Sequence, residues 1–319
     1  MKKINYKAFI ENEFLIVPKN GGSPTPFIFN DVQNKYHSLL TREYPDMQGV
    51  RENILKARQE GFSALIDAIF AVDFLMYENI TAQIISHKEK ETKALIQRVN
   101  FFFDYYLQNN GLTRRQLFKT DSQDFLENRE NGSELFIGTA GAKTLGRGDT
   151  LQNLHWSEVG FYPTSEILSA EKLVNGAEQQ VATGVGKIFR ESTGNIQGDF
   201  WHTELKRSES GESGFKFRFF AWFENLEYQT PVEVFEPSPE EQRIMQKYGT
   251  NKAQMQWYRN KMAEFKTKAL GLREYPTTSE EAFLAAGSGF FDADALKFYY
   301  DTSKEAVNQG NLAMDGNWV

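Results

Sequence analysis

Cysteine is absent from the 319 residues of this sequence, which excludes disulfides, thiolate metal ligands and a cysteine nucleophile. No apolar run approaches the roughly 20 residues that a membrane-spanning helix needs, and the N-terminal segment lacks the long apolar stretch of a signal peptide. We therefore expect no membrane partner, and a reducing, intracellular setting fits. Histidine is scarce and never has the spacing of a helical zinc motif; the four positions are His37, His87, His155 and His202.

Positive charge is in deficit, with 36 Lys and Arg against 43 Asp and Glu and a net charge of -7. This balance speaks weakly against a general nucleic-acid binder, although a local basic face can bind while the rest of the surface is acidic. A hydrophobic content of 40% and a charged content of 25% are typical of ordinary globular proteins. The 27 phenylalanines indicate a large aromatic core.

Strand-like and helix-like segments alternate along most of the chain, which is typical of an α/β fold with a largely parallel, helix-covered sheet. The expected strands are 52–57, 81–87, 133–140, 151–158, 186–192 and 214–223, and the expected helices between them are 62–78, 88–108 and 165–180. Polar-faced helices are expected at 237–249 and 251–271. We divide the chain into an N-terminal segment and loop (1–30), a core (31–236), a helical lid (237–285) and a linker (286–319).

The stretch "KARQEGFS", residues 56–63, follows a strand and opens a helix, where a phosphate-binding loop would lie. Gly61 permits a close backbone turn, and the hydroxyl of Ser63 can reach a phosphate-bound Mg²⁺. Phe62 stands where the usual loop has its lysine, so Lys56 and Arg58 are the candidates for the missing charge. The alternative is a polar turn with solvated basic residues, and the octapeptide alone leaves both interpretations open.

A second strand, "LQNLHWSE", ends in Ser157 and Glu158. In P-loop NTPases a core strand ends in an acid that helps to hold Mg²⁺, often with a second acid that orients the attacking water. Glu158 would be that base, and Ser157 could bind the metal only weakly through its hydroxyl. By itself, a glutamate at a strand end is also common on protein surfaces.

Two further segments lie where such a site needs them. "FRESTGN" places the hydroxyls of Ser192 and Thr193 at a strand end, where they could sense the γ-phosphate and relay its loss; an ordinary polar turn is the alternative. "LGRGDT" places Arg147 between glycines, where it could stabilise transition-state charge or simply be solvated. Together these segments predict a P-loop NTPase of the ASCE or RecA-like type, with a small helical C-terminal lid.

In order and spacing, these pieces resemble the ATPase domain of tailed-phage large terminases, the genome-packaging motors. The segments that carry the resemblance are "PFIFNDVQ", "KARQEGFSALIDAI", "TLGRGDTLQNLHWSEVG", "RESTGN", "FFAWFENLEY" and "REYPTTSEEAF". The resemblance implies ATP and Mg²⁺ as ligands, an arginine finger at Arg147 that acts in trans, a coupling motif at Ser192 and Thr193, and a metal contact from Ser63. The family's acid strand normally ends in Asp-Glu, so Glu158 matches the catalytic glutamate, whereas Ser157 departs from the pattern at the metal-binding position. It implies nucleotide contacts from Gln33, which would read adenine, and from Lys56, Arg58, Gln59, Glu60, Gly61, Phe62, Ser63 and Ala64.

The function that follows is an ATP-hydrolysing motor that moves double-stranded DNA into a procapsid. Its expected partners are DNA, a portal protein, a small terminase subunit and further copies of the chain in a ring, a pentamer, at the portal vertex in the host cytoplasm. We expect no nuclease activity, since residues 286–319 would lead toward a nuclease domain that is absent. The alternatives are a helicase-like, nucleic-acid-dependent ATPase and a catalytically weak nucleotide-binding module, the latter supported by Phe62 and Ser157.

Overall fold

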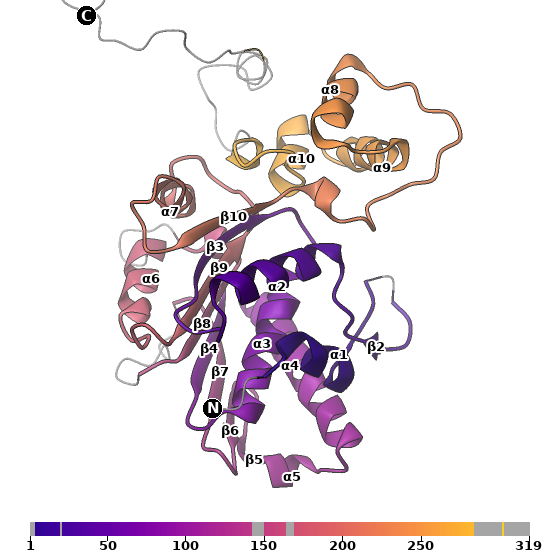
Figure 1. Cartoon of the computed structure of the whole chain (residues 1–319). Coiled ribbons are helices and arrows are strands. Elements are labelled where there is room, and N and C mark those ends of the chain that lie inside the picture. The colour runs from indigo at the N-terminus through magenta and orange to yellow at the C-terminus, as the bar shows by residue number, and fades with distance from the viewer. Residues whose placement is uncertain (1–3, 20, 142–149, 164–168, 284–301, 303–319) are drawn as a thin grey trace, which may run out of the picture.

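The computed structural model describes residues 4–19, 21–141, 150–163, 169–283 and 302. Its centre is an eight-stranded sheet in the order β10-β3-β9-β8-β4-β7-β6-β5 (Figure 1). Neighbours from β10 to β7 are parallel, and β6 and β5 continue the sheet as antiparallel strands. The strands are β3 (Arg51–Lys56), β4 (Thr81–Ser86), β5 (Phe118–Asp121), β6 (Phe125–Asn128), β7 (Glu134–Thr139), β8 (Asn153–Ser157), β9 (Lys187–Ser192) and β10 (Lys216–Phe220).

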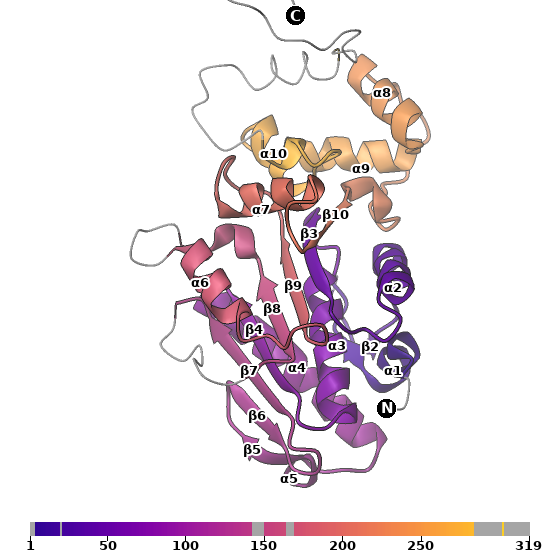
Figure 2. The same ribbon diagram turned by 60° about the vertical axis from the view of Figure 1, so that its left-hand side comes forward.

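Helices cover both faces of this sheet, which confirms the predicted α/β architecture (Figure 2). One face packs against α1 (Tyr6–Glu13), α2 (Asp31–Glu43), α3 (Phe62–Met76) and α4 (Glu89–Asn109), and the other against α6 (Ala170–Glu178) and α7 (Phe200–Glu209). Side chains alternate along a strand, so Ile54 of β3 joins the first apolar cluster and Leu55 joins the second. Burial on both faces is what a parallel central strand requires.

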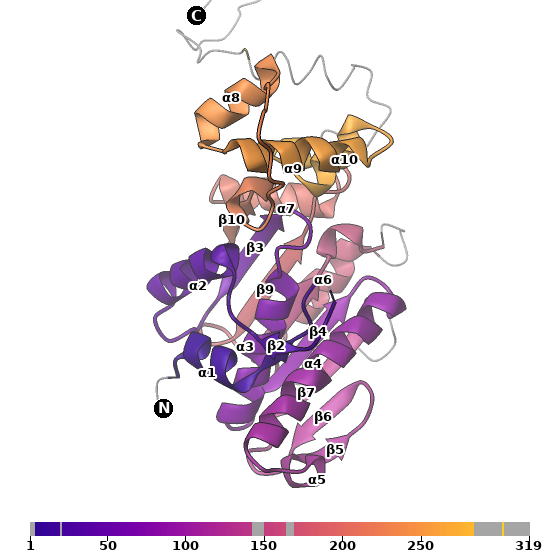
Figure 3. The same cartoon turned by 90° about the vertical axis from the view of Figure 1, so that its right-hand side faces the viewer.

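The segment predicted as a lid lies beyond β10 and β3, and its helices pack against residues of the core in a third apolar cluster (Figure 3). It consists of α8 (Pro239–Tyr248), α9 (Lys252–Ala263) and α10 (Lys268–Glu274). The ring of Trp222 stacks on that of Tyr258 at 4.4 Å, and that of Tyr228 stacks on Trp257 at 4.2 Å. A single helix over 251–271 was wrong, because the side chain of Thr267 caps a new helix by accepting from the Leu270 amide.

Several short elements went unpredicted. They are β1 (Leu15–Ile16), β2 (Thr25–Pro26), the β5–β6 hairpin, α5 (Arg114–Leu117), and the 3-10 turns η1 (Val159–Phe161), η2 (Trp222–Glu224) and η3 (Glu281–Phe283). Helix α1 and helix α7 were also missed. Such short segments carry too few residues for a periodic pattern, and long-range packing decides their conformation. None of the helices in the described part of the chain is long and apolar enough to cross a membrane.

Candidate active site

Three neighbouring parallel strands end at one edge of the sheet and bring their last residues together there. Lys56 ends β3, Ser192 ends β9 and Ser157 ends β8, with β9 between the other two. A cavity of about 1030 Å³ opens at this edge. In open α/β sheets, ligands bind outside the carboxyl ends of the strands, and this volume is that of a small-molecule or cofactor site.

The loop between β3 and α3 has the backbone of an anion cradle. Gln59 (φ 63°) and Gly61 (φ 84°) are both left-handed, and no side chain in the described chain caps the N-terminus of α3. The first amides of this helix therefore remain free to meet an anion. A side chain at Gly61 would be strained by this left-handed φ, and its Cβ atom, 2.6 Å from Nε2 of Gln33, would force the Gln33 side chain to move.

Two side chains from the start of α2 hold this loop in place. Gln33 Nε2 donates to the Gly61 carbonyl at 2.8 Å, and Asn30 Nδ2 donates to the Glu60 carbonyl at 3.1 Å. The Gln33 Oε1 atom accepts from the Asn30 amide at 3.0 Å in a capping box. Both ends of the Gln33 amide are thus engaged within the protein, and its role toward adenine stays a prediction.

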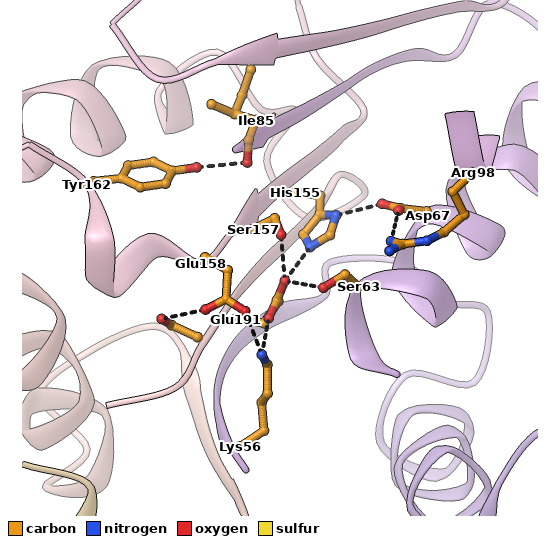
Figure 4. Close-up of polar contacts among 11 residues, drawn as sticks. Lys56, Ser63, Asp67, Ile85, Arg98, His155, Ser157, Glu158, Tyr162 and Glu191 are labelled. Atoms are coloured by element: carbon orange, nitrogen blue, oxygen red, sulfur yellow. Dashed lines mark hydrogen bonds and ion pairs between the residues drawn. The ribbon is translucent and has the colours of Figure 1, made fainter. Parts of the chain in front are cut away.

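Lys56 is buried between two carboxylates, one from strand β9 and one from the residue that follows strand β8 (Figure 4). Its Nζ lies 2.8 Å from Oε1 of Glu158 and 3.2 Å from Oε2 of Glu191. Burial lowers the pKa of the Lys56 ammonium, but the two carboxylates raise it more, so the net pKa lies above that of a free lysine. A permanent ammonium therefore lies at the edge of the cavity.

Glu191, in the middle strand β9, contacts several residues of the site and was not predicted from the sequence. Its Oε1 accepts hydrogen bonds from the hydroxyls of Ser63 at 2.7 Å and Ser157 at 2.8 Å. The Nε2 atom of His155 lies 3.5 Å from the same oxygen. Burial raises the pKa of Glu191, but Lys56 and His155 outweigh burial and hold the pKa well below the usual range. A fully buried carboxylate is thereby kept ionised beside the predicted metal-binding hydroxyls.

Glu191 is in turn contacted by His155, which belongs to a chain of charged and polar side chains that continues to Asp67 and Arg98. Nδ1 of His155 lies 3.0 Å from Oδ1 of Asp67, and Arg98 Nη1 donates to Oδ2 of Asp67 at 2.8 Å (Figure 4). Burial lowers the pKa of His155, and the contacts with Asp67 and Glu191 raise it above its ordinary value. One signal was visible in the sequence: helix α3 is apolar apart from Ser63, Asp67 and Asp73, and a buried acid demands a partner.

Glu158, the predicted base, directly follows β8 in a left-handed conformation (φ 55°). This conformation is strained for a residue other than glycine and is concentrated at functional sites. The side chain is partly exposed and lines the cavity. Ser192 Oγ donates to Oε2 of Glu158 at 3.3 Å, so the predicted coupling serine contacts the predicted base. Thr193, the other coupling residue, also lines the cavity.

The remaining predicted residues fall into different places. Arg58 lines the cavity but pairs with Glu274 of α10 at 2.8 Å. Phe62 is buried under the loop between Tyr36 and Phe220, with ring centroids at 5.2 and 4.7 Å. Gln59, Glu60 and Ala64 also line the cavity. Arg147 lies outside the described residues, as does the proposed linker 286–319 apart from residue 302.

A parallel sheet with an uncapped helix N-terminus, a lysine and a strand-end glutamate around one cavity defines the chain as a P-loop-type ATPase fold. No family model and no curated protein matches the sequence. Among solved structures, the HK97 bacteriophage large terminase matches with a TM-score of 0.52 at 13% identity, over 78% of this chain and 52% of that one. The fold is therefore similar to that of part of the HK97 large terminase, and the chain spans about half the length of that protein.

Further solved structures match less closely in shape. The ATPase domain of the Thermus phage P74-26 large terminase gives a TM-score of 0.44 at 15% identity, over 76% of this chain and 96% of that one. The large terminase of another thermophilic bacteriophage gives 0.46 at 14% identity, over 69% and 50% of the two chains.

Proposed function

We propose that this chain is the ATP-hydrolysing motor domain of a viral terminase, which moves double-stranded DNA into a procapsid. The convergence of Lys56, Ser63 and Glu158, from three separate elements, at one cavity edge carries the proposal. The fold shared with the HK97 large terminase supports it. Phosphoryl transfer needs little covalent chemistry from the protein, so positioning and charge are what such a site must supply.

The triphosphate of ATP would lie on the uncapped N-terminus of α3, with Lys56 and Arg58 as its cationic contacts. Lys56 Nζ and Glu158 Oε1 form an ion pair at 2.8 Å. The negative charge of the triphosphate would therefore compete with Glu158 for the Lys56 ammonium. Glu158, released from this ion pair, would orient a water molecule and hold the proton that the water loses. The new bond forms between the water oxygen and the γ-phosphorus, and the bond to the β–γ bridging oxygen breaks, which yields ADP and phosphate.

The residues present also fit a magnesium ion. Ser63 and Ser157 bring their hydroxyls to within 2.7 and 2.8 Å of one Glu191 oxygen, and Mg²⁺ prefers oxygen ligands together with substrate phosphates. Ser63 and Ser157 are the residues that would hold it. When bound, the ion would neutralise phosphate charge.

The partners of this motor follow from the same proposal. Contacts with DNA would go mainly to phosphates and would be salt-sensitive and independent of sequence. The active form would be a homomeric ring, a pentamer, at the portal vertex of a procapsid in the host cytoplasm, together with a portal protein and a small terminase subunit. Binding to a purified portal ring separates this function from that of a helicase-like ATPase, which has no reason to bind a portal.

The substitution Glu158→Gln tests the catalytic role. We expect steady-state phosphate release with double-stranded DNA to fall by roughly 10²–10⁴-fold, as for the loss of a general base, while nucleotide binding is retained. Assays should use protein concentrations that permit ring assembly. Glu130→Gln, a change of an exposed glutamate outside the cavity, is the matched control and should leave turnover unchanged. Unchanged turnover in Glu158→Gln would contradict the role of Glu158 as the base.

A further inference from the structure

Strand β8 lacks an acid where P-loop sites ordinarily have one. In that class, the strand that ends with the water-orienting glutamate also carries an acid that helps to hold Mg²⁺. Here that position is Ser157, whose hydroxyl is neutral. A hydroxyl alone would leave the divalent charge of the ion without a protein carboxylate beside it, so the site needs an acid from another element.

Glu191 supplies a carboxylate at the same place from β9. The side chain is fully buried, and its Oε1 lies within 2.8 Å of the hydroxyls of both Ser63 and Ser157. Figure 4 shows the three side chains converging from α3, β8 and β9. Its Oε2 faces Lys56 at 3.2 Å and has no hydrogen-bond partner in the part of the chain that the structure describes. A buried carboxylate therefore lies directly behind the two hydroxyls that line the cavity.

The contacts behind Glu191 resemble the outer support of a metal site rather than a surface ion pair. His155 lies between Glu191 and Asp67, at 3.5 and 3.0 Å, and is itself fully buried. Arg98 anchors Asp67 from the cavity wall. Such outer partners fix the orientation of the groups next to a metal. An ion pair with Lys56 alone would not need this second row.

We propose that Glu191 replaces the acid that position 157 lacks and positions the Mg²⁺ of the ATPase site. It does so by accepting the hydrogen bonds of the Ser63 and Ser157 hydroxyls, which fixes the orientation of both oxygens toward the ion. This inference rests on the proposed function. It places the metal-positioning acid on the coupling strand, directly before Ser192, instead of on the strand that carries the base. Strand β9 would then carry both the acid that positions the metal and the serine that responds when the phosphate leaves.

The test is the effect of magnesium on nucleotide affinity. The affinity for ATP-γ-S is measured with Mg²⁺ and with EDTA, and the ratio of the two is compared between wild type and Glu191→Gln. We expect the Mg²⁺-dependent gain to shrink by about 10–100-fold, the usual cost of losing a partner next to a metal ligand, with affinity in EDTA kept. If Glu191 only neutralises Lys56, both affinities change together and the ratio stays constant, which overturns the inference.

Glu52→Gln is the matched control, because Glu52 is also a fully buried strand glutamate with a cationic partner, Arg218, but lies at the opposite end of β3 from Lys56. Its ratio should equal that of wild type. Should Glu191→Gln fail to fold in thermal unfolding, the exchange variant Ser157→Asp with Glu191→Ala takes its place. Because this variant moves the carboxylate to β8, it should keep the gain in ATP-γ-S affinity that Mg²⁺ gives. A folded exchange variant whose affinity is the same with Mg²⁺ and with EDTA contradicts the inference. A wild type that binds no ATP-γ-S at all would instead refute the proposed function.

Discussion

The charged residues at the end of β3 and in the loop that leads to α3 have very different environments although they are close in sequence. Lys56 is buried between two carboxylates, whereas Arg58 is largely exposed and paired with Glu274 of the lid. Glu60 is fully buried, and neither of its carboxyl oxygens has a hydrogen-bond partner among the described residues. Lys56 and Arg58 can therefore contact a phosphate, whereas the ionised form of Glu60 lowers the stability of the fold.

Glu60 should make stability depend on pH. Burial, and then the charge of Glu224, raise the pKa of Glu60 well above its ordinary value. The folded state therefore binds the proton more tightly than the unfolded state, so stability is highest below the unfolded pKa of roughly 4.3 and falls as pH rises toward the folded pKa. Glu60→Gln, which mimics the protonated form, should gain at least about 1 kcal/mol over wild type between pH 5 and pH 8.

Denaturant unfolding at several pH values checks this prediction. Glu233→Gln, a change of an exposed glutamate, is the control and should show no pH-dependent difference from wild type. A constant gap between Glu60→Gln and wild type across the pH range would show that Glu60 is not the group responsible.

At the scale of elements, the end of β9 packs directly against the turn that closes the described lid. A Cβ atom added to Gly194 would lie 2.0 Å from the carbonyl oxygen of Ala282 in η3. Asn195 Nδ2 also donates to the Gly160 carbonyl at 2.8 Å, next to the base. The segment that follows β9 thus contacts both the turn after Glu158 and η3, which is the position that the proposed coupling role needs.

Gly194→Ala should therefore destabilise the fold by about 1–3 kcal/mol, the usual cost of overpacking, because backbone must move to admit the methyl group. Thermal unfolding measures the loss. Gly214→Ala is the control, since nothing lies within 4 Å of a Cβ atom there, and it should have almost no effect. Equal stability of the two variants would mean that β9 and η3 are not held in contact.

At the scale of the whole molecule, a ring in which Arg147 acts in trans can be tested by mixing inactive variants. Arg147→Ala and Glu158→Gln should each lack turnover, but their mixture should recover it, because some interfaces then combine an intact base with a neighbour's intact arginine. For random assembly into a closed ring, about a quarter of the sites are complete. Phosphate release from the mixture measures the recovery, and a mixture as inactive as its parts would place Arg147 in its own subunit.

Most of the sheet and much of the site could be predicted from local pattern. The strands before Lys56 and before Glu158 were visible as apolar runs with a polar residue at the end. Because parallel strands share their carboxyl edge, these residues could be expected to meet. The hairpin of β5 and β6 and the break between α9 and α10 could not, since a few residues or one cap decide them.

Local sequence is enough to specify a strand, a glycine-containing loop and a buried helix around Lys56–Ser63, because turn chemistry and apolar periodicity act over a few residues. The identity of the acid beside Ser63, in contrast, depends on long-range packing. Glu191 lies 128 positions away in the chain, and it reaches Ser63 because β9 is inserted between β3 and β8. Strand order depends on how whole layers pack, and no local stretch of the sequence encodes it.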